Sequence, residues 1–473
     1  MKIIDFQIYR IDLQTRIPFK YGIATMTRVP EIFVRLRAEF GNGESTGFAS
    51  DCLPPKWFTK IPDKPLDAEI DEMLLVIRRA LETSRKISVP SLFAFWKALY
   101  DEQDQWARQR TMPPLLAHFG TSLVERALID AFCRLSRVTF AQAVQGGLFK
   151  IDLGELRPEL RGRTPADFLP KTPLSKVIAR HTIGLADALT DDEIPPTERL
   201  NDGLPQSLEA SVRRYGLKHF KVKVNGQLAN DLTRLKRIAG ILHSQCGSKY
   251  AFTLDANEQF KSIGDFQAWW RAVRAEPMLD GLWERLLFVE QPVHRDFALR
   301  PEVAAEFKSW RQRPPIIIDE SDGSLDAVST ALRLAYAGAS HKNCKGVIKG
   351  IANRCLIAQS GANLIMSGED LCNIGPVALQ QDLAVMAVLG IDSVERNGHH
   401  YHAGLSQFPA GIQEQVATNQ SDLYRRSGSG WPTVAIANGE IKLTTVNAAP
   451  FGVGFLLDPK GLTPIALPLD SVP

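Results

Sequence analysis

The sequence has few cysteines and no cysteine pattern. Six cysteines are scattered along 473 residues, with no CxxC pair and no closely spaced framework. They are Cys52, Cys133, Cys246, Cys344, Cys355 and Cys372. Zinc ribbons and small disulfide-stabilised domains depend on such spacing, so the sequence excludes both classes. We therefore expect six reduced thiols in a cytoplasmic protein that is long enough to bury its own core.

An excess of one charge sign and a long apolar run are also missing. The 56 basic and 53 acidic residues leave a net charge of only +3, which gives no reason to expect nucleic acid or a membrane surface as a partner. No stretch of about 18 uncharged apolar residues occurs, so we expect no transmembrane helix. The N-terminus has no apolar segment typical of a secretory signal. A phosphate-loop motif is absent as well.

A regular alternation of strand-like and helix-like segments fills the middle of the chain. Strand-like runs begin near residues 178, 218, 250, 286, 315, 343, 363 and 391, with helix-period segments between them. Such alternation is typical of βα units and a parallel sheet. Eight units over about 220 residues fit a closed barrel. We therefore predict an N-terminal α+β domain (1–155), a barrel domain (176–400) and a C-terminal segment (401–473) that returns to the first domain.

Three acidic residues each end one of three successive apolar runs. Asp255 follows 251–254, Glu290 follows 286–289 and Asp319 follows 316–318. In a parallel barrel the carboxyl ends of the strands open into one mouth, so we expect these side chains to meet there. Three converging carboxylates would raise one another's pKa unless a cation lay between them. Mg²⁺ prefers such oxygen ligands, and the trio contains no cysteine or histidine that would favour Zn²⁺.

Lysines flank the acidic residues. Lys221 and Lys223 lie on the strand-like segment 219–224, and strand alternation places both on one face. A lysine inside a barrel is costly unless it has a function. A metal ion and a second lysine nearby would lower an ammonium pKa, so that the amine could act as a base near neutral pH. Farther along, Lys345 and Lys349 fall on or just after the segment 343–348, which we predict to be a strand.

The order of these motifs resembles the enolase superfamily, in the mandelate racemase/muconate lactonizing enzyme family and its muconate-lactonizing branch. The motifs stand here as Lys221-Val222-Lys223, Asp255-Ala256-Asn257, Glu290-Gln291-Pro292, Asp319-Glu320-Ser321 and Lys345. Three further segments resemble a capping-domain helix, the first barrel strand and the seventh barrel strand of that family. They are Leu128-Ile129-Asp130-Ala131, His181-Thr182-Ile183-Gly184 and Ile365-Met366-Ser367-Gly368-Glu369. The resemblance covers most of residues 1–455.

The resemblance implies a modified TIM barrel, (β/α)7β, with an α+β capping domain. It implies that Asp255, Glu290 and Asp319 ligate Mg²⁺ and that the substrate is a small carboxylate bound through its carboxylate oxygens. Lys223 would remove the proton α to that carboxylate, and the metal would hold the resulting enediolate. Lys221 would help to lower the pKa of Lys223. The expected enzyme is an isomerase, a racemase/epimerase or a cycloisomerase.

The second lysine is less certain in position than the first. Lys345 on the opposite face would return the proton in a racemisation, or act as a fixed cation in a cycloisomerisation. In the family that lysine is usually followed three residues later by another basic residue, whereas Lys345 and Lys349 are four apart. Lys349 or Lys342 therefore remains an alternative second base. Glu369 is expected to be a pocket residue.

Other functions remain open at this point. An acid-sugar dehydratase would use the same chemistry, and a barrel can keep its acidic residues yet only bind a ligand. His399, His400 and His402 form a cluster that could ligate a metal in a hydrolase, although we expect them to be loop histidines. Substrate specificity should come from the loops at Phe19–Met26 and Ser50–Trp57. The sequence names no substrate and leaves open whether the protein forms a homo-oligomer.

Overall fold

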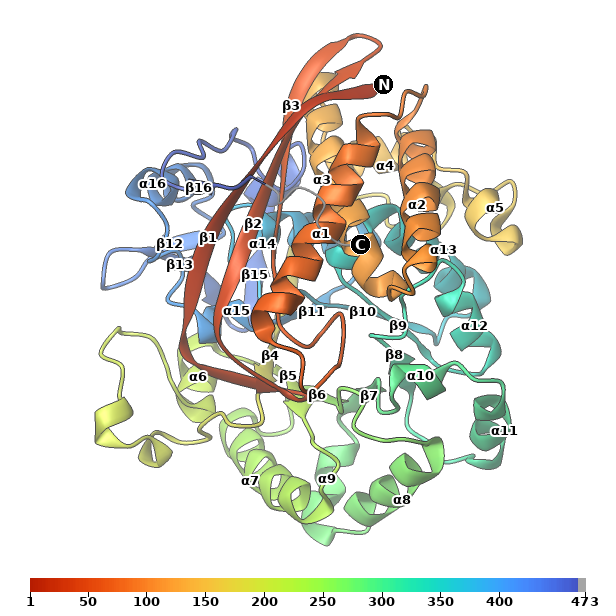
Figure 1. Cartoon of the computed structure of the whole chain (residues 1–473). Coiled ribbons are helices and arrows are strands. Elements are labelled where there is room, and N and C mark those ends of the chain that lie inside the picture. The colour runs from red at the N-terminus through yellow and green to blue at the C-terminus, as the bar shows by residue number, and fades with distance from the viewer. Residues whose placement is uncertain (467–473) are drawn as a thin grey trace.

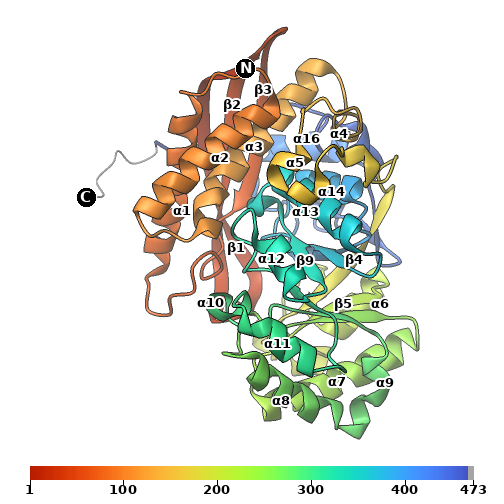
Figure 2. The same cartoon turned by 90° about the vertical axis from the view of Figure 1, so that its right-hand side faces the viewer.

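The fold is known from a computed structural model in which residues 1–466 are described. A three-stranded antiparallel meander with one added strand and a layer of helices forms the N-terminal domain (Figures 1 and 2). Its elements are β1 (Lys2–Tyr21), β2 (Ala24–Phe40), β3 (Gly43–Cys52), α1 (Leu66–Ser84), α2 (Leu92–Gln109), α3 (Pro114–Ser136) and α4 (Phe140–Gln145). The helices α1 to α3 lie along one side of the sheet in Figure 2, which fits the predicted α+β capping domain.

The helix α3 packs very closely on the sheet. It begins with Pro114, which tolerates a first-turn position because its missing N–H needs no helical partner there. It ends at Arg137, which adopts a left-handed conformation with φ of 53°. Gly47 of β3 faces the helix, and a Cβ at this position would lie 2.1 Å from the carbonyl oxygen of Ala127. Only glycine allows the strand and the helix to approach so closely.

Eight parallel strands form a closed barrel. Each strand pairs with the next, and the last strand pairs with the first in parallel, Ser393 opposite Ile178. The strands are β4 (Lys176–Ile183), β5 (His219–Lys223), β6 (Ala251–Asp255), β7 (Leu286–Glu290), β8 (Ile316–Ile318), β9 (Gly338–His341), β10 (Ile365–Gly368) and β11 (Ser393–Arg396). The strand interiors are rich in buried Val, Ile, Leu and Phe, as expected of strands covered on both faces.

Helices connect the first seven strands and cover the outside of the barrel. They are α6 (Leu208–Tyr215), α7 (Leu228–Cys246), α8 (Ile263–Arg274), α9 (Asp280–Trp283), α10 (Arg295–Ala298), α11 (Glu302–Ser309), α12 (Ala327–Arg333), α13 (Val347–Ser360) and α14 (Ala378–Leu389). The eighth strand is followed only by the short helix α15 (Gly398–Tyr401). Seven βα units and a last strand make the modified TIM barrel (β/α)7β with a capping domain, so the predicted fold class is confirmed.

One predicted strand is wrong. Seven of the eight expected strands lie where the sequence places them, but the sixth was predicted at 343–348 and is found at Gly338–His341. Residues 343–345 form a 3-10 turn, and α13 begins at Val347. The strand β9 has the sequence Gly-Ala-Ser-His, which lacks the apolar β-branched residues that mark a strand. Val347 and Ile348 are apolar because they begin the buried helix α13, and in the sequence this apolar pair resembles part of a strand.

A linker joins the capping domain to the barrel, and the C-terminal tail pairs with both of them. The linker carries α5 (Leu153–Leu156) and two 3-10 turns (Pro158–Leu160 and Pro165–Asp167), and two more turns follow β4 (Asp191–Glu193 and Pro196–Glu198). The tail contains α16 (Ala410–Asn419), β12 (Tyr424–Arg426), β13 (Pro432–Val434), β14 (Ile436–Ala437), β15 (Glu440–Lys442), α17 (Thr444–Ala448) and β16 (Thr463–Pro464). The tail pairs with both units: β15 with β4, and β16 with β1 of the capping sheet. The expected C-terminal segment 401–473 extends beyond the described residues at its end.

The capping domain also contacts the barrel through a helix end. Glu125 of α3 accepts hydrogen bonds from the backbone N–H groups of Val347 (3.0 Å) and Ile348 (2.6 Å) at the start of α13. A carboxylate at a helix N-terminus satisfies N–H groups that have no partner within the helix. Burial nevertheless raises the pKa of Glu125 to about 7. The contact fixes the capping domain over the barrel at the turn that carries Lys345.

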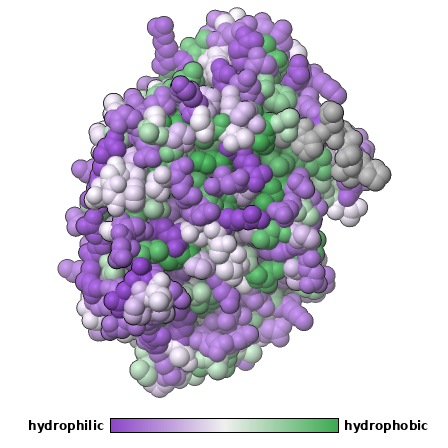
Figure 3. Space-filling model, turned by 60° about the vertical axis from the view of Figure 1, so that its left-hand side comes forward, coloured by the Kyte–Doolittle hydropathy of each residue, from purple (hydrophilic) through white to green (hydrophobic). Residues whose placement is uncertain are grey.

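Figure 3 shows a face on which hydrophilic side chains predominate and hydrophobic ones lie in separate small areas. Within residues 1–466 we find no helix with the length and apolar character needed to span a membrane.

Candidate active site

The carboxyl ends of the central barrel strands bring the predicted residues side by side. Lys223, Asp255 and Glu290 are direct neighbours in register on β5, β6 and β7. Asp319 follows β8, whose Ile317 pairs with Glu290. All three acidic side chains are buried. The three strands therefore end at one level in the barrel mouth, where we expected the acidic residues to meet.

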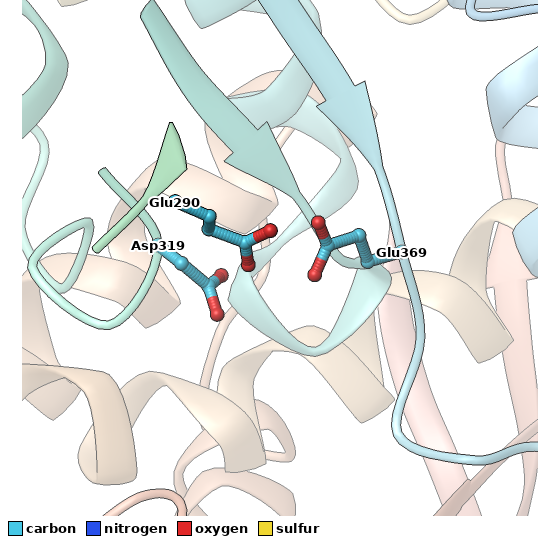
Figure 4. Close-up of side chains that lie close together, drawn as sticks. All are labelled: Glu290, Asp319 and Glu369. Atoms are coloured by element: carbon cyan, nitrogen blue, oxygen red, sulfur yellow. The ribbon is translucent and has the colours of Figure 1, made fainter. Parts of the chain in front are cut away.

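The tightest group of carboxylates differs from the predicted trio in one member. Oxygens of Glu290, Asp319 and Glu369 lie within 4.8 Å of one another, and Figure 4 shows the three carboxylates turned toward a common point. Glu369 follows β10, the seventh barrel strand. Asp255 lies beside this group, with its Oδ2 2.9 Å from Lys221 Nζ and 2.5 Å from Lys223 Nζ. The site therefore contains four carboxylates where the sequence indicated three.

Lys221 lies among all of these carboxylates. Its Nζ is 2.9 Å from Asp255 Oδ2 and donates hydrogen bonds to Glu290 Oε1 (3.0 Å), Glu369 Oε2 (2.7 Å) and Glu395 Oε2 (2.8 Å). Burial opposes the charged form, but the carboxylates outweigh it and raise the pKa of Lys221 well above its ordinary value. This residue is a fixed cation of the mouth.

Lys342 is the second lysine of the mouth. It follows β9 directly, and its Nζ is 2.7 Å from both Asp319 Oδ2 and Glu369 Oε2. It also lies 5.2 Å from the ring of Trp57, a capping-domain residue. The strand β9 is four strands away from β5 in a barrel of eight, so Lys342 and Lys223 lie on opposite sides of the mouth.

The two other candidates for the second lysine lie elsewhere. Lys345 is on the 3-10 turn below the mouth, where its Nζ donates to Asp319 O (2.8 Å), Asp319 Oδ1 (2.7 Å) and Ser340 O (3.0 Å). Lys349 is on α13 and pairs with Asp322 at 2.8 Å. The misplaced strand made Lys345 the first choice. The spacing of three residues from Lys342 to Lys345 is the sequence signal that points to Lys342, the lysine that lines the cavity.

Charge compensation differs among the carboxylates of the mouth. Burial would raise the pKa of Asp319, but Lys342 and Lys345 hold it below its ordinary value. Lys221 and Lys342 likewise outweigh burial and hold the pKa of Glu369 well below its usual range. Glu290 is the exception, because burial and the neighbouring Glu369 raise its pKa well above the ordinary value.

The mouth has the donor set of a site for a hard divalent cation. All of its acidic ligands are carboxylate oxygens, which Mg²⁺ prefers over nitrogen or sulfur. Glu290 Oε2 is buried and accepts no hydrogen bond, although Lys221 Nζ lies 2.9 Å away. A buried carboxylate oxygen without a hydrogen bond is costly, and a bound cation would satisfy it. The residues present therefore fit a divalent metal ion.

Several residues of the mouth escaped the sequence analysis. Glu395 is the penultimate residue of the last barrel strand and contacts Lys221, and its place near the strand end is similar to the signal that identified the first acidic residues. Arg180 of β4 lies below, with its Nη2 3.4 Å from Glu369 Oε1. Asn257 accepts a hydrogen bond from Lys223 Nζ (2.8 Å). We use the term mouth cluster for ten charged residues: Arg180, Lys221, Lys223, Asp255, Glu290, Asp319, Lys342, Lys345, Glu369 and Glu395.

A small cavity of about 50 Å³ lies between the mouth cluster and the capping domain. Lys223 and Lys342 both line it, whereas Lys345 and Lys349 do not. On the capping side its walls come from the hairpin tip between β1 and β2 and from the loop after β3. These are the segments Phe19–Met26 and Ser50–Trp57, in which we expected the determinants of specificity.

The predicted histidine cluster lies apart from the mouth cluster. His399 and His400 are on the short helix α15; His400 and His402 are buried, and His399 is half-buried. His181 Nδ1 of β4 lies 3.0 Å from His399 Nε2. Burial lowers the pKa of His400 to about 3. Within residues 1–466, no histidine joins the group of carboxylates that could hold a metal, which disfavours the hydrolase alternative.

The fold and the strand-end carboxylates define a modified parallel barrel with an acidic, lysine-flanked mouth under a capping domain. Residues 204–429 match the family model described as enolase C-terminal domain-like. The match and the fold together confirm the resemblance to the enolase superfamily, in its mandelate racemase/muconate lactonizing enzyme group. No curated protein matches the chain in sequence.

Solved structures of this group share the fold over nearly the whole chain. A mandelate racemase/muconate lactonizing protein from Herpetosiphon aurantiacus is 15% identical with a TM-score of 0.59, covering 94% of this chain and 97% of its own. The 2-chloromuconate cycloisomerase from Rhodococcus opacus is 16% identical with a TM-score of 0.59, covering 97% of this chain and 97% of its own. The N-succinyl Arg/Lys racemase from Bacillus cereus is 17% identical with a TM-score of 0.57, covering 94% of this chain and 97% of its own. At these identities the similarity establishes the fold and not the reaction.

Proposed function

We propose that the protein is a Mg²⁺-dependent isomerase that removes the α-proton of a small carboxylate substrate. The observation that carries the proposal is the placement of Lys223 and Lys342 on opposite sides of one cavity, with buried carboxylates between them. Amines on both faces of a bound substrate are what the removal and return of a proton require. The solved racemase and cycloisomerase with the same fold support this reaction type.

Each residue of the mouth has a distinct part in this proposal. Asp255, Glu290 and Asp319 would hold Mg²⁺, with Glu369 beside them. Mg²⁺ bound there would stabilise the negative charge that develops on the substrate carboxylate as the α-proton leaves. Lys223 removes the proton from one face, and Lys342 delivers a proton to the other. Lys221 remains charged and compensates part of the negative charge of the surrounding carboxylates.

Two alternatives receive less support. An acid-sugar dehydratase of the mandelate-racemase type would use a histidine from the seventh barrel strand, and β10 has the sequence Ile-Met-Ser-Gly. A barrel that only binds a ligand would have little reason to bury lysines in its mouth, because each buried ammonium group requires compensating carboxylates.

Exchange of the α-proton for deuterium tests the proposal. The protein with Mg²⁺ in D₂O should exchange the α-proton of enantiopure carboxylates, followed by ¹H NMR. In a racemase, Lys223→Ala should abolish exchange for one enantiomer and Lys342→Ala for the other, each by about 10²- to 10⁴-fold or more. In a cycloisomerase, loss should be confined to Lys223→Ala.

Lys345→Met serves as the matched comparison. Lys345 supports Asp319 from below and does not line the cavity. The variant should therefore weaken exchange of both enantiomers alike, through the metal site. Undiminished exchange in Lys223→Ala would refute the assignment of the base, and enantiomer-specific loss in Lys345→Met would restore Lys345 as the second lysine.

A further inference from the structure

The cavity over the mouth cluster has two halves of opposite chemistry. Its floor is polar and contains three lysines and three carboxylates of the mouth with two asparagines: Lys221, Lys223, Lys342, Asp255, Asp319, Glu395, Asn257 and Asn397. Its roof comes from the capping domain and is formed by Phe19, Tyr21, Met26, Pro54 and Trp57, with Leu371 at the side. A carboxylate held at the floor must therefore place the rest of its molecule against aromatic and aliphatic side chains.

Two polar atoms of the roof segments already have partners within the protein. The hydroxyl of Tyr21 donates to Pro55 O (2.8 Å) within the capping domain. The backbone oxygen of Trp57 accepts a hydrogen bond from Arg295 Nη2 (2.9 Å). The ring of Phe19 stacks on Tyr401, with centroids 4.0 Å apart. The roof therefore presents hydrocarbon surface and offers a ligand little opportunity for hydrogen bonding.

Charged groups near the roof are neutralised by partners of their own. Lys60 lies next to the loop after β3, but its Nζ donates to Asn257 O and lies 3.4 Å from Glu258 Oε2. Asp370 borders the cavity, but its Oδ2 lies 2.5 Å from Arg396 Nη2. Among the residues that the structure describes around the cavity, no charged side chain of the roof remains to pair with a second charge on a ligand.

The size of the cavity adds a second restriction. A volume of about 50 Å³ holds only a few water molecules, whereas sites for larger ligands measure about 300–1,000 Å³. So small a volume favours a compact body over a long chain. A long or highly hydroxylated chain would leave hydroxyl groups buried against hydrocarbon without partners, which is costly.

We propose that the ligand is a compact monocarboxylate with an apolar alkyl or aryl body, without a second charge and without a polyhydroxy chain. The inference rests on the proposed function, since it takes the carboxylate to be bound at the floor. It adds the chemistry of the remaining part of the substrate, which the floor alone leaves open.

Binding measured by calorimetry tests the inference without reference to turnover. The Mg²⁺-loaded full-length protein is titrated with 2-phenylpropanoate, with phenylsuccinate, which adds a second carboxylate to a similar body, and with gluconate, a polyhydroxy acid. We expect 2-phenylpropanoate to bind at least about 10-fold more tightly than either of the others, because a buried group without a partner reduces affinity by about that factor or more. Equal or tighter binding of phenylsuccinate or gluconate would overturn the inference.

A change in the roof should change the preference. Met26→Lys places a cation among the roof residues and should reverse the ranking of 2-phenylpropanoate and phenylsuccinate, whereas Met26→Leu should preserve it. The titration of the unchanged protein decides the matter even if Met26→Lys fails to fold. Selective binding without any α-proton exchange would refute the proposed function and leave the ligand class standing, while exchange with a reversed ranking would refute only the ligand class.

Discussion

The protein has two buried clusters of charged residues, one in the barrel mouth and one between the domains. They differ in how far basic side chains compensate the charge of the carboxylates. The mouth cluster has five carboxylates and five basic side chains. The second, which we call the interface cluster, lies where β2, β3 and α3 of the capping domain meet α14 and β11 of the barrel. It consists of Glu31, Asp51, Arg126, Asp370, Asp382 and Arg396.

The balance of charge decides which carboxylates ionise. In the interface cluster two arginines serve four carboxylates, so burial dominates and raises the pKa of Glu31 to about 8 and that of Asp370 to about 6. Burial and Asp51 raise the pKa of Asp382 well above its ordinary value. In the mouth, lysines hold the pKa of Asp319 and Glu369 low. Nearby lysines thus favour the ionised form of Asp319 and Glu369 in the mouth, whereas burial favours the protonated form of Glu31 and Asp382 at the interface. Glu290 is the exception in the mouth, and ionised oxygens are the better metal ligands.

Removing a cation from the interface cluster should have the largest effect on stability. Arg396→Met deletes the partner of Asp370 (2.5 Å) and a donor to Asn373 O (2.8 Å), leaving buried acceptors without compensation. We expect the free energy of unfolding in urea to fall by about 3–5 kcal/mol. Arg426→Met, which removes a solvent-exposed pair with Glu414, is the control and should change it by less than about 1 kcal/mol. Equal effects of the two variants would show that the interface cluster does not depend on its arginines.

A carboxylate in each cluster should affect metal binding differently. Glu290→Gln removes a charged oxygen ligand from the mouth and should weaken the affinity for Mg²⁺ by at least about 10-fold in a calorimetric titration. Glu31→Gln makes the same change at the interface and should leave Mg²⁺ affinity unchanged. An unaltered Mg²⁺ titration for Glu290→Gln would remove this residue from the metal site, and a loss in Glu31→Gln would show that the two clusters are coupled.

A third difference concerns the pH dependence of stability. The pKa of Glu31 rises from about 4.5 in the unfolded chain to about 8 in the folded protein, so the folded state binds a proton more tightly between these pH values. Its contribution is fully present below pH 4.5 and is lost as pH rises toward 8. The slope is at most about 1.4 kcal/mol per pH unit for one proton.

Glu31→Gln provides the matched comparison, because it keeps the shape of the side chain and its acceptor for Ser50 Oγ (2.5 Å). The free energy of unfolding of this variant, measured in urea at several pH values from 4.5 to 8, should fall less steeply than that of the unchanged protein. Parallel curves for the two proteins would mean that Glu31 is ionised in the folded state.

The fold was largely predictable from local sequence. Seven barrel strands appear in the sequence as short apolar runs at regular intervals, and acidic residues at the ends of several of them indicate the barrel mouth. The prediction failed at β9, because a strand of small and polar residues is stable only between two neighbouring strands. That one error moved the second lysine of the cavity from Lys342 to Lys345.

The amino-acid sequence determined the order of the strands and the residues at their ends. Strands buried on both faces require runs of apolar residues, and polar residues are left at the strand ends. The sequence does not determine the partners of each charged group, because ionisation depends on distances between residues that are far apart in the chain. Glu369 meets Glu290 and Lys342 only when the barrel closes, and Glu31 meets Asp382 only when the domains dock. Three-dimensional packing therefore decided which acids are ionised and which lysine faces the cavity.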